Sequence, residues 1–341
     1  MEYGYTLIYQ IKIYNSDPIC SIDLNDELLL FGTMLGYCGY YTLKSEQKLI
    51  IISEIEDEHI TGTIIKKNKL YISVGDEKII VITKKNNSFN DTNITELNNY
   101  EDDNAHYKIC EKVFTMMKGN LIFQIQLNIP REEQSSAKID DCYWKTKNIN
   151  NSITSNGIIR ISNYWAPFDF SGKYLIFLEF LGEHKRTFDI FSCYDKKFIK
   201  QINLSEIKEN IGHISHAKIL KDEKIFMVHS YKICQIRDFE FKLIKEFVHH
   251  GNEIIAIDVY YKNKTDKNYE IAILDLNCDV YKYNSKDDAE VYMLNLHKLS
   301  CISTQIKDQK FFSIGWPYFI KIFKNLVAIT TDQGCFILKQ S

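Results

Sequence analysis

A short pattern of small, apolar and polar residues recurs along the chain. Each copy begins with a small residue, has an apolar residue three positions later and a polar turn after it, and continues as an apolar run. A polar turn between apolar runs is typical of a β-hairpin, and recurrence at about 20 to 50 residues is typical of a repeat architecture. The copies begin at Ser21, Gly62, Ala217, Ala256 and Ser303.

The spacing of the turns gives the number of repeats. From Asp26 to Asp308, six intervals cover 282 residues, a mean of 47. A blade of four antiparallel strands needs roughly 40 to 50 residues, so the chain has room for seven. The turn markers are Asp26, Asn68, Gly119, Gly172, Asp222, Asp266 and Asp308.

The apolar alternation places the strands. Residues 5–14 alternate before the first full unit, so we expect them to form the outer strand of the last blade and close the ring, which removes an exposed sheet edge. Residues 300–316 fit the recurring unit and predict the first hairpin of blade seven, although residues 318–338 also resemble a hairpin. Strands are expected at 19–24, 28–34, 37–43 and 49–55 in blade one, at 78–83 in blade two, at 174–180 and 186–193 in blade four, and at 271–276 and 280–283 in blade six.

Histidines stand before several hairpins, at His59, His106, His213, His250 and His297. The best copy runs from Gly212-His213 through Ala217 to Arg237-Asp238. Here the chain resembles the WD-repeat β-propellers, in which a Gly-His pair precedes the innermost strand and a Trp-Asp pair ends the third. The resemblance implies structural roles for His213, in a hydrogen bond within its blade, and for Asp238. Arg237 takes the place of the family tryptophan, and the chain contains no Trp-Asp dipeptide.

The expected fold class is therefore all-β: a single seven-bladed propeller with four-stranded antiparallel blades. Two polar stretches, residues 84–103 and 130–156, contain too few apolar residues to pack and predict surface insertions in one domain that spans residues 1–341. Such loops carry function more often than strands do.

Composition agrees with a strand-rich intracellular protein. The chain contains 22 Tyr and 20 Phe, residue types that favour strands. Its nine cysteines are an odd number without a Cys-x-x-Cys pair, which favours reduced, buried thiols and a cytoplasmic or nuclear location. Neither a signal peptide nor a membrane-spanning helix is expected. The net charge of −3 and only four arginines disfavour direct nucleic-acid binding.

No catalytic, cofactor or metal site is expected. His213 and His216 have a metal-like spacing, but on a strand they turn to opposite faces. We find no nucleophile elbow and no Gly-rich phosphate loop. The small residues that begin the repeats would leave a central channel without a converging acid, base or nucleophile.

Two kinds of residue are candidates for protein contact. Acidic runs could bind a basic partner, or could simply be solvated loops. Aromatic residues at blade ends could carry interface energy, or could be ordinary core. The acidic candidates are Glu56, Asp57, Glu58, Glu101, Asp102 and Asp103, and the aromatic candidates are Tyr143, Trp144, Trp316 and Tyr318.

The function expected from these features is a non-catalytic scaffold or adaptor subunit that binds other protein subunits, with no small-molecule substrate. Two alternatives stay open. One is a propeller enzyme with a site in its central channel, and the other is a propeller that binds phosphoinositides at a membrane surface. The paired-arginine motif of the lipid-binding propellers is absent from the sequence.

Overall fold

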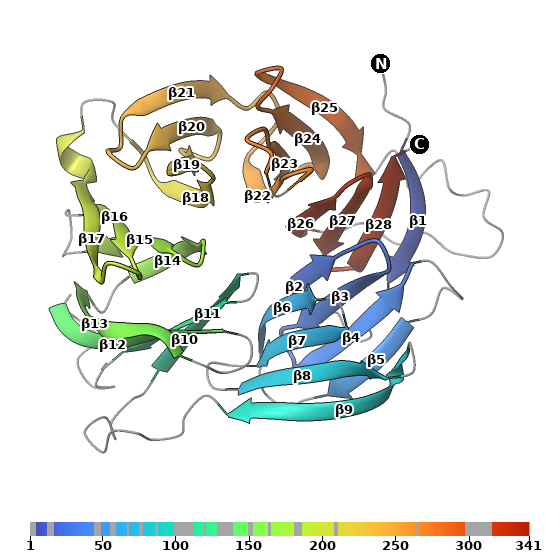
Figure 1. Ribbon diagram of the computed structural model, residues 1–341. Helices are drawn as coiled ribbons and strands as arrows, with labels where there is room; N and C mark the ends of the chain where they lie inside the picture. Colours follow the sequence, from blue (N-terminus) through green and yellow to red (C-terminus); the bar gives the residue numbers. More distant parts are fainter. Residues whose placement is uncertain are drawn as a thin grey trace. The chain divides into compact units, whose positions relative to one another are not determined.

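The chain forms seven four-stranded antiparallel sheets, seen as groups of four arrows in Figure 1. This computed structural model describes residues 5–11, 17–43, 49–54, 59–66, 68–74, 78–85, 88–98, 112–118, 121–127, 139–148, 153–162, 165–180, 186–207, 211–263, 265–296 and 316–340. The predicted all-β class, with seven four-stranded blades, is confirmed.

The described residues divide into two compact units. Unit 1 comprises Met1–Gly75, Ile82–Asn93 and Val248–Ser341, and unit 2 comprises Asp76–Val81 and Ile94–Phe247. Four sheets contribute to unit 1. One of these four, the sheet of β6 to β9, also contributes residues to unit 2.

The first two sheets follow the predicted hairpins closely. In the first sheet the two middle strands, β3 and β4, are buried along almost their whole length, because each is a nearly continuous apolar run. Its strands are β2 (Ile19–Leu24), β3 (Leu28–Thr33), β4 (Tyr37–Thr42) and β5 (Leu49–Glu54). The second sheet contains β6 (Ile60–Lys66), β7 (Lys69–Val74), β8 (Lys78–Lys85) and β9 (Ser88–Asn98).

Three sheets follow in unit 2. A short 3-10 turn, η2 (Leu204–Glu206), follows the second of them. The strands are β10 (Lys112–Lys118), β11 (Leu121–Leu127), β12 (Ile139–Asn148) and β13 (Ile153–Ser162); β14 (Trp165–Phe170), β15 (Tyr174–Phe180), β16 (Arg186–Ser192) and β17 (Lys197–Asn203); and β18 (Ile214–Leu220), β19 (Lys224–His229), β20 (Ile233–Asp238) and β21 (Leu243–Val248).

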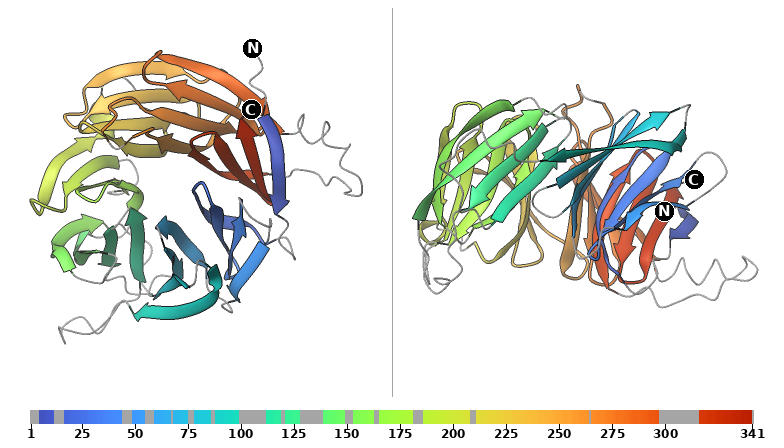
Figure 2. Two further views of the ribbon diagram at one scale, coloured as in Figure 1. Left: turned by 45° about the vertical axis from the view of Figure 1, so that its right-hand side comes forward. Right: turned by 90° about the horizontal axis from the view of Figure 1, so that it is seen from below.

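The last two sheets belong to unit 1. The sixth contains β22 (Ile254–Tyr260), β23 (Glu270–Asp275), β24 (Asp279–Asn284) and β25 (Ala289–Asn295). The seventh contains β26 (Pro317–Phe323), β27 (Leu326–Thr331), β28 (Gly334–Gln340) and β1 (Tyr5–Ile11). Both views of Figure 2 show β1 running along β28, and their antiparallel pairing confirms the predicted closure by the N-terminal strand.

The seventh sheet corrects the assignment of its first hairpin to residues 300–316. The hairpin is β26–β27, which spans Pro317–Phe323 and Leu326–Thr331, whereas residues 300–315 lie outside the described part of the chain. The tight turn between the strands places Lys324 at φ +55°, and every residue of β27 is buried. The hairpin is therefore located by the tight turn at Lys324 and the buried run that follows it. The small residue that begins the other repeats does not locate it.

The structure also corrects the two predicted polar insertions. Residues 88–98 of the first stretch form β9, the fourth strand of its sheet. In the second stretch, β12 begins at Ile139 and β13 at Ile153, and the two strands pair with each other, with β13 at the edge of the sheet. Backbone hydrogen bonds to a neighbouring strand can hold a polar segment in a sheet, so low apolar content alone did not make these residues loops.

Neighbouring sheets bury their apolar faces against each other. In unit 1, one cluster joins the sixth and seventh sheets, and another joins the seventh and first. In unit 2, one cluster joins the sheets of β10–β13 and β14–β17, and another joins the latter to the sheet of β18–β21. A single sheet could not bury both of its faces alone, so each depends on its neighbours.

Candidate interaction surface

The first strands of several sheets carry an aspartate that accepts a backbone hydrogen bond from the next sheet. The donor is in each case the main-chain N–H of an isoleucine in the next sheet's first strand. Asp23 Oδ2 on β2 accepts from Ile65 at 2.8 Å, Asp169 Oδ2 on β14 from Ile219 at 2.9 Å, and Asp258 Oδ2 on β22 from Ile322 at 3.0 Å. These carboxylates therefore tie neighbouring sheets together.

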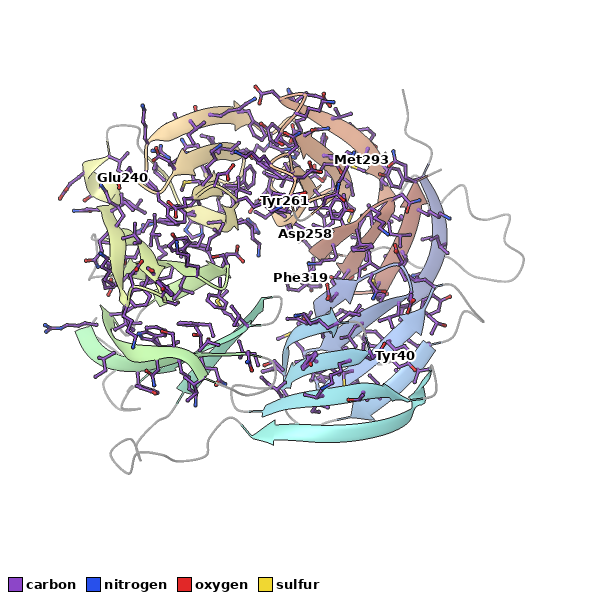
Figure 3. All side chains as sticks on the ribbon, viewed as in Figure 1. Tyr40, Glu240, Asp258, Tyr261, Met293 and Phe319 are labelled. Carbon is purple, nitrogen blue, oxygen red and sulfur yellow. The ribbon has the colours of Figure 1, made fainter. Side chains whose placement is uncertain are left out.

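Each of these aspartates has a lysine nearby, and two of them, Asp23 and Asp258, share the same lysine. Lys218 Nζ lies 3.7 Å from Asp169 Oδ1 in unit 2. In unit 1, Lys321 Nζ on β26 lies 3.5 Å from Asp258 Oδ1 and 3.8 Å from Asp23 Oδ1. Figure 3 marks Asp258 on β22. Lys321 thus balances two carboxylates from the sheets on either side of β26.

The electrostatics of Asp23 follow from its surroundings. Burial raises the pKa of Asp23 above its ordinary range, while Lys321 and the backbone donor at Ile65 oppose the rise. Beside it, Ser21 Oγ lies 2.9 Å from Thr63 Oγ1 on β6. The aspartates were not among the residues predicted from the sequence, although Asp23 and Asp258 both directly precede the apolar residue that stands three positions after the small residue of the repeat.

Of the two predicted structural residues of the sheet formed by β18–β21, His213 has different surroundings from those expected, whereas Asp238 has a structural contact. The His213 side chain is exposed, and its ring contacts that of Tyr231 at 5.9 Å between centroids, in place of the expected hydrogen bond within the blade. Asp238 is half-buried and closes the turn between β20 and β21, where its Oδ1 accepts from the Lys242 N–H at 2.8 Å. The buried histidine of this sheet is His229, whose pKa is lowered by burial.

Arg237, at the position of the family tryptophan, is buried. Its Nε donates to Gln235 Oε1 at 2.8 Å, its Nη1 donates to the Phe241 carbonyl at 2.7 Å, and its guanidinium lies 4.6 Å from the Phe241 ring centroid. A planar guanidinium can both stack on an aromatic ring and donate hydrogen bonds. It therefore fills this position in the core without a tryptophan.

Two adjacent histidines bind one buried carboxylate in unit 1. His249 Nδ1 lies 2.6 Å from Glu290 Oε1, and His250 Nδ1 lies 2.7 Å from Oε2. Burial by itself raises the pKa of Glu290, but these hydrogen bonds outweigh it and lower the pKa. Among the described residues, no group of three or more His, Cys, Asp or Glu side chains is placed to hold a metal ion.

The predicted aromatic candidates separate into buried and exposed residues. Trp144 is fully buried, packed against Phe123 and Phe191, so its assignment to an interaction surface is wrong. Tyr143 is half-buried, and its hydroxyl accepts from Asn156 Nδ2 at 3.1 Å. The acidic candidates, at residues 56–58 and 101–103, lie outside the described residues.

Trp316 and Tyr318 are exposed, as predicted, at the beginning of the seventh sheet. Trp316 is 62 % exposed, and Tyr318 and Phe319 on β26 also present much of their surface to solvent. The Trp316 N–H donates to Asp332 Oδ1 at 3.2 Å, and the Asp332 N–H donates to the Trp316 carbonyl at 3.1 Å. Phe319, marked in Figure 3, was not among the sequence candidates.

Comparison with known proteins gives a fold but no family assignment. No protein-family model matches the chain, and no curated protein matches its sequence. The WD40 β-propeller domain of Doa1 is similar in structure, with a TM-score of 0.61 at 10 % identity over 99 % of this chain and 98 % of that one. The chain has the WD40-type β-propeller fold.

Two further solved structures are similar to the chain. A chain from the mitotic checkpoint complex has a TM-score of 0.61 at 6 % identity, over 100 % of this chain and 93 % of that one. The computationally designed Ika8 protein has a TM-score of 0.59 at 9 % identity, over 99 % of this chain and 100 % of the design. The expected resemblance to WD-repeat propellers is confirmed at the level of fold.

Proposed function

We propose that this WD40-type propeller is a non-catalytic scaffold or adaptor subunit of a multisubunit complex in the cytoplasm or nucleus. The observation that carries the proposal is the exposed aromatic group of Trp316, Tyr318 and Phe319. Large aromatic side chains are rarely left exposed together without a partner, and Trp and Tyr frequently dominate binding energy at protein interfaces. The solved mitotic checkpoint complex includes a chain of similar fold, which fits a role in an assembly.

The charged residues of the first strands support a structural role over a catalytic one. Asp23, Asp169 and Asp258 each accept a backbone N–H from the next sheet, and Lys218 and Lys321 neutralise them. A general base or nucleophile must instead be within reach of a substrate and tuned for transfer. These carboxylates are used to join sheets.

Membrane-surface binding is supported less well than protein binding. The sequence contains no Arg-Arg pair. Within the residues that the structure describes, no helix is long and apolar enough to cross a membrane. We therefore place the aromatic group at an interface with protein.

Affinity purification from the cells that express the protein tests this function. We expect the tagged parent to retain other proteins in fixed stoichiometry, and the Trp316→Ala, Tyr318→Ala double variant to lose at least one of them. Tyr194→Ala is the matched control, because Tyr194 is 78 % exposed on another sheet. Recovery of the parent alone, under gentle conditions and with cross-linking, would contradict a scaffold function.

A further inference from the structure

Five exposed apolar residues of unit 1 lie near the end where the first strands β2 and β26 begin. Met34 and Leu35, in the turn after β3, are 47 % and 54 % exposed, and the Met34 N–H donates to the Pro18 carbonyl just before β2. Trp316 occupies the same position before β26 that Pro18 occupies before β2. The turn after β3 and the start of β26 therefore mark the same end of their respective sheets.

The strands that carry these residues are neighbours in the same register. Lys321 on β26 forms an ion pair with Asp23 on β2. Lys321 lies five residues after Trp316, and Asp23 lies five residues after Pro18. Because both residues lie the same number of positions before the Lys321–Asp23 ion pair, Trp316 and Pro18 lie at the same height along the two neighbouring strands. We call the surface formed by Met34, Leu35, Trp316, Tyr318 and Phe319 the aromatic edge.

A carboxylate under the aromatic edge lacks a full set of partners. Asp17 is only 3 % exposed, and its Oδ1 accepts from the Leu35 N–H at 3.0 Å. Its Oδ2 is buried and has no hydrogen-bond partner among the described residues. A buried carboxylate oxygen without a donor is costly, so a donor supplied by a ligand would be favoured strongly.

The charge around the aromatic edge is acidic. Asp332 is half-buried and holds the Trp316 N–H through Oδ1. In the described turns at this end of unit 1, residues 17–18, 34–36, 276–278 and 331–333, there are Asp residues but neither Lys nor Arg. The basic side chain beside them is the exposed His59, whose Nδ1 contacts the Met34 carbonyl oxygen. An anionic partner would be repelled here, whereas a cationic one would be attracted.

We propose that the aromatic edge binds a segment of a partner protein that carries an arginine or lysine side chain flanked by apolar residues. The cation would lie against Trp316 and donate to Asp17 and Asp332, and the apolar flanks would cover Leu35 and Phe319. Arginine suits such a site best, because it stacks on an indole and donates to carboxylates in the same pose. This inference rests on the proposed scaffold function and names the chemistry of its partner.

Selection of short random peptides displayed on phage against the full chain tests the proposal. We expect enriched peptides to share one basic residue beside apolar ones. Fluorescence anisotropy of a synthetic peptide from that set should show binding that weakens about tenfold in Trp316→Ala and several-fold in Asp332→Asn, as for loss of an interface anchor. Replacing the peptide's basic residue by Gln should weaken binding to the parent by a similar factor.

Asp17→Asn separates binding from folding. Asparagine keeps the acceptor for the Leu35 N–H and removes the unpaired charge, so we expect the melting temperature to stay the same or rise while peptide affinity falls. Tyr194→Ala should change neither quantity. Enrichment of acidic or purely apolar peptides overturns the proposal, as does undiminished affinity in Trp316→Ala. Binding of the parent, but not of Trp316→Ala, to phosphatidylcholine vesicles without any basic peptide would overturn it in favour of a membrane.

The outcomes distinguish this inference from the scaffold function. If the Trp316→Ala variant retains the same partner proteins as the tagged parent, the scaffold function stands, but the aromatic edge is not the docking site. If no protein is retained but the basic peptides bind as described, the site is real and the scaffold function is wrong.

Discussion

Trp144 and Trp316 show how the surroundings of a residue decide its role. Trp144 lies opposite Gly157 in the β12–β13 pair, and a Cβ added at Gly157 would come within 3.3 Å of the indole. Because Gly157 has no side chain, the indole of Trp144 has room to pack in the core. Trp316 precedes β26, where nothing in the described part of unit 1 covers most of its ring.

The two tryptophans should differ sharply in their contribution to stability. We expect Trp144→Ala to lower the free energy of unfolding by about 3 to 5 kcal/mol, because it removes a buried aromatic side chain and leaves a cavity. Trp316→Ala should change it by less than about 0.5 kcal/mol, as for other exposed positions. Urea denaturation followed by circular dichroism measures both, and equal midpoints for the two variants would contradict the burial assigned to Trp144.

A second residue-scale feature is the pair of carboxylates in the sheet of β14–β17. Asp189 is fully buried and Glu179 nearly so, and Thr187 Oγ1 donates to Asp189 Oδ2 at 2.9 Å. Burial, and then the neighbouring Glu179 carboxylate, raise the pKa of Asp189 to about 8. The folded protein therefore keeps a proton on this side chain at neutral pH.

Stability should consequently fall as the pH rises. In the unfolded chain an aspartate loses its proton near about pH 3.9, so between about pH 4 and about pH 8 the folded state binds more protons than the unfolded state. The stabilisation that Asp189 provides through its bound proton is complete below about pH 4, and it is lost as the pH rises through about 8. Melting temperatures across this range should decline in the parent and decline less in Asp189→Asn. Asp222→Asn, at an exposed turn, should keep the parent slope, and an unchanged slope in Asp189→Asn would count against the raised pKa.

At the scale of elements, the ion pairs between first strands should matter more than those at the surface. Lys321→Met leaves the partly buried carboxylates of Asp23 and Asp258 without their shared cation, so we expect a loss of about 1 to 3 kcal/mol of unfolding free energy. Lys324→Met is the matched control. It breaks the exposed pair with Asp26 and the contact of its ammonium with the Phe323 ring, which together should contribute less than about 1 kcal/mol.

Denaturant melts of the two lysine variants compare these contributions directly. A larger loss in Lys324→Met than in Lys321→Met would show that the paired aspartates do not join the sheets as their geometry indicates. High salt should reduce the effect of Lys324→Met more than that of Lys321→Met, because exposed charges are screened more effectively.

Elements whose residues alternate between apolar and polar were predictable from the sequence. The strands β3 and β19 are apolar runs that follow polar turns, and β21 alternates between half-buried and exposed residues, so each could be placed from the sequence. The strand β9 could not be found this way, because Ser88–Asn98 is polar and is held by pairing in its sheet. The same limit applies to the site: whether Asp23 is tied to Ile65 depends on a neighbouring sheet 42 residues further along, which no local pattern reports.

At the scale of the whole molecule, burial between consecutive sheets favours cooperative unfolding within each of the two units. Each hydrophobic cluster draws residues from two consecutive sheets, so loss of one sheet exposes a face of the next. That the two units unfold together, as a single domain over residues 1–341, stays a prediction. Buried cysteines in both units offer a way to test it, because all seven described cysteines are free thiols.

Six of these thiols should become reactive at the same urea concentration. They are Cys38, Cys278 and Cys335 in unit 1 and Cys142, Cys193 and Cys234 in unit 2, and all are buried. Burial raises the pKa of Cys193 to about 12, and burial with nearby carboxylates does the same for Cys278, so little of the nucleophilic thiolate exists in the folded state. Pulse labelling with iodoacetamide, followed by mass spectrometry of the six peptides, should therefore give one shared midpoint. Two midpoints, one for each set of three thiols, would show that the units unfold independently and that the chain comprises two folding domains.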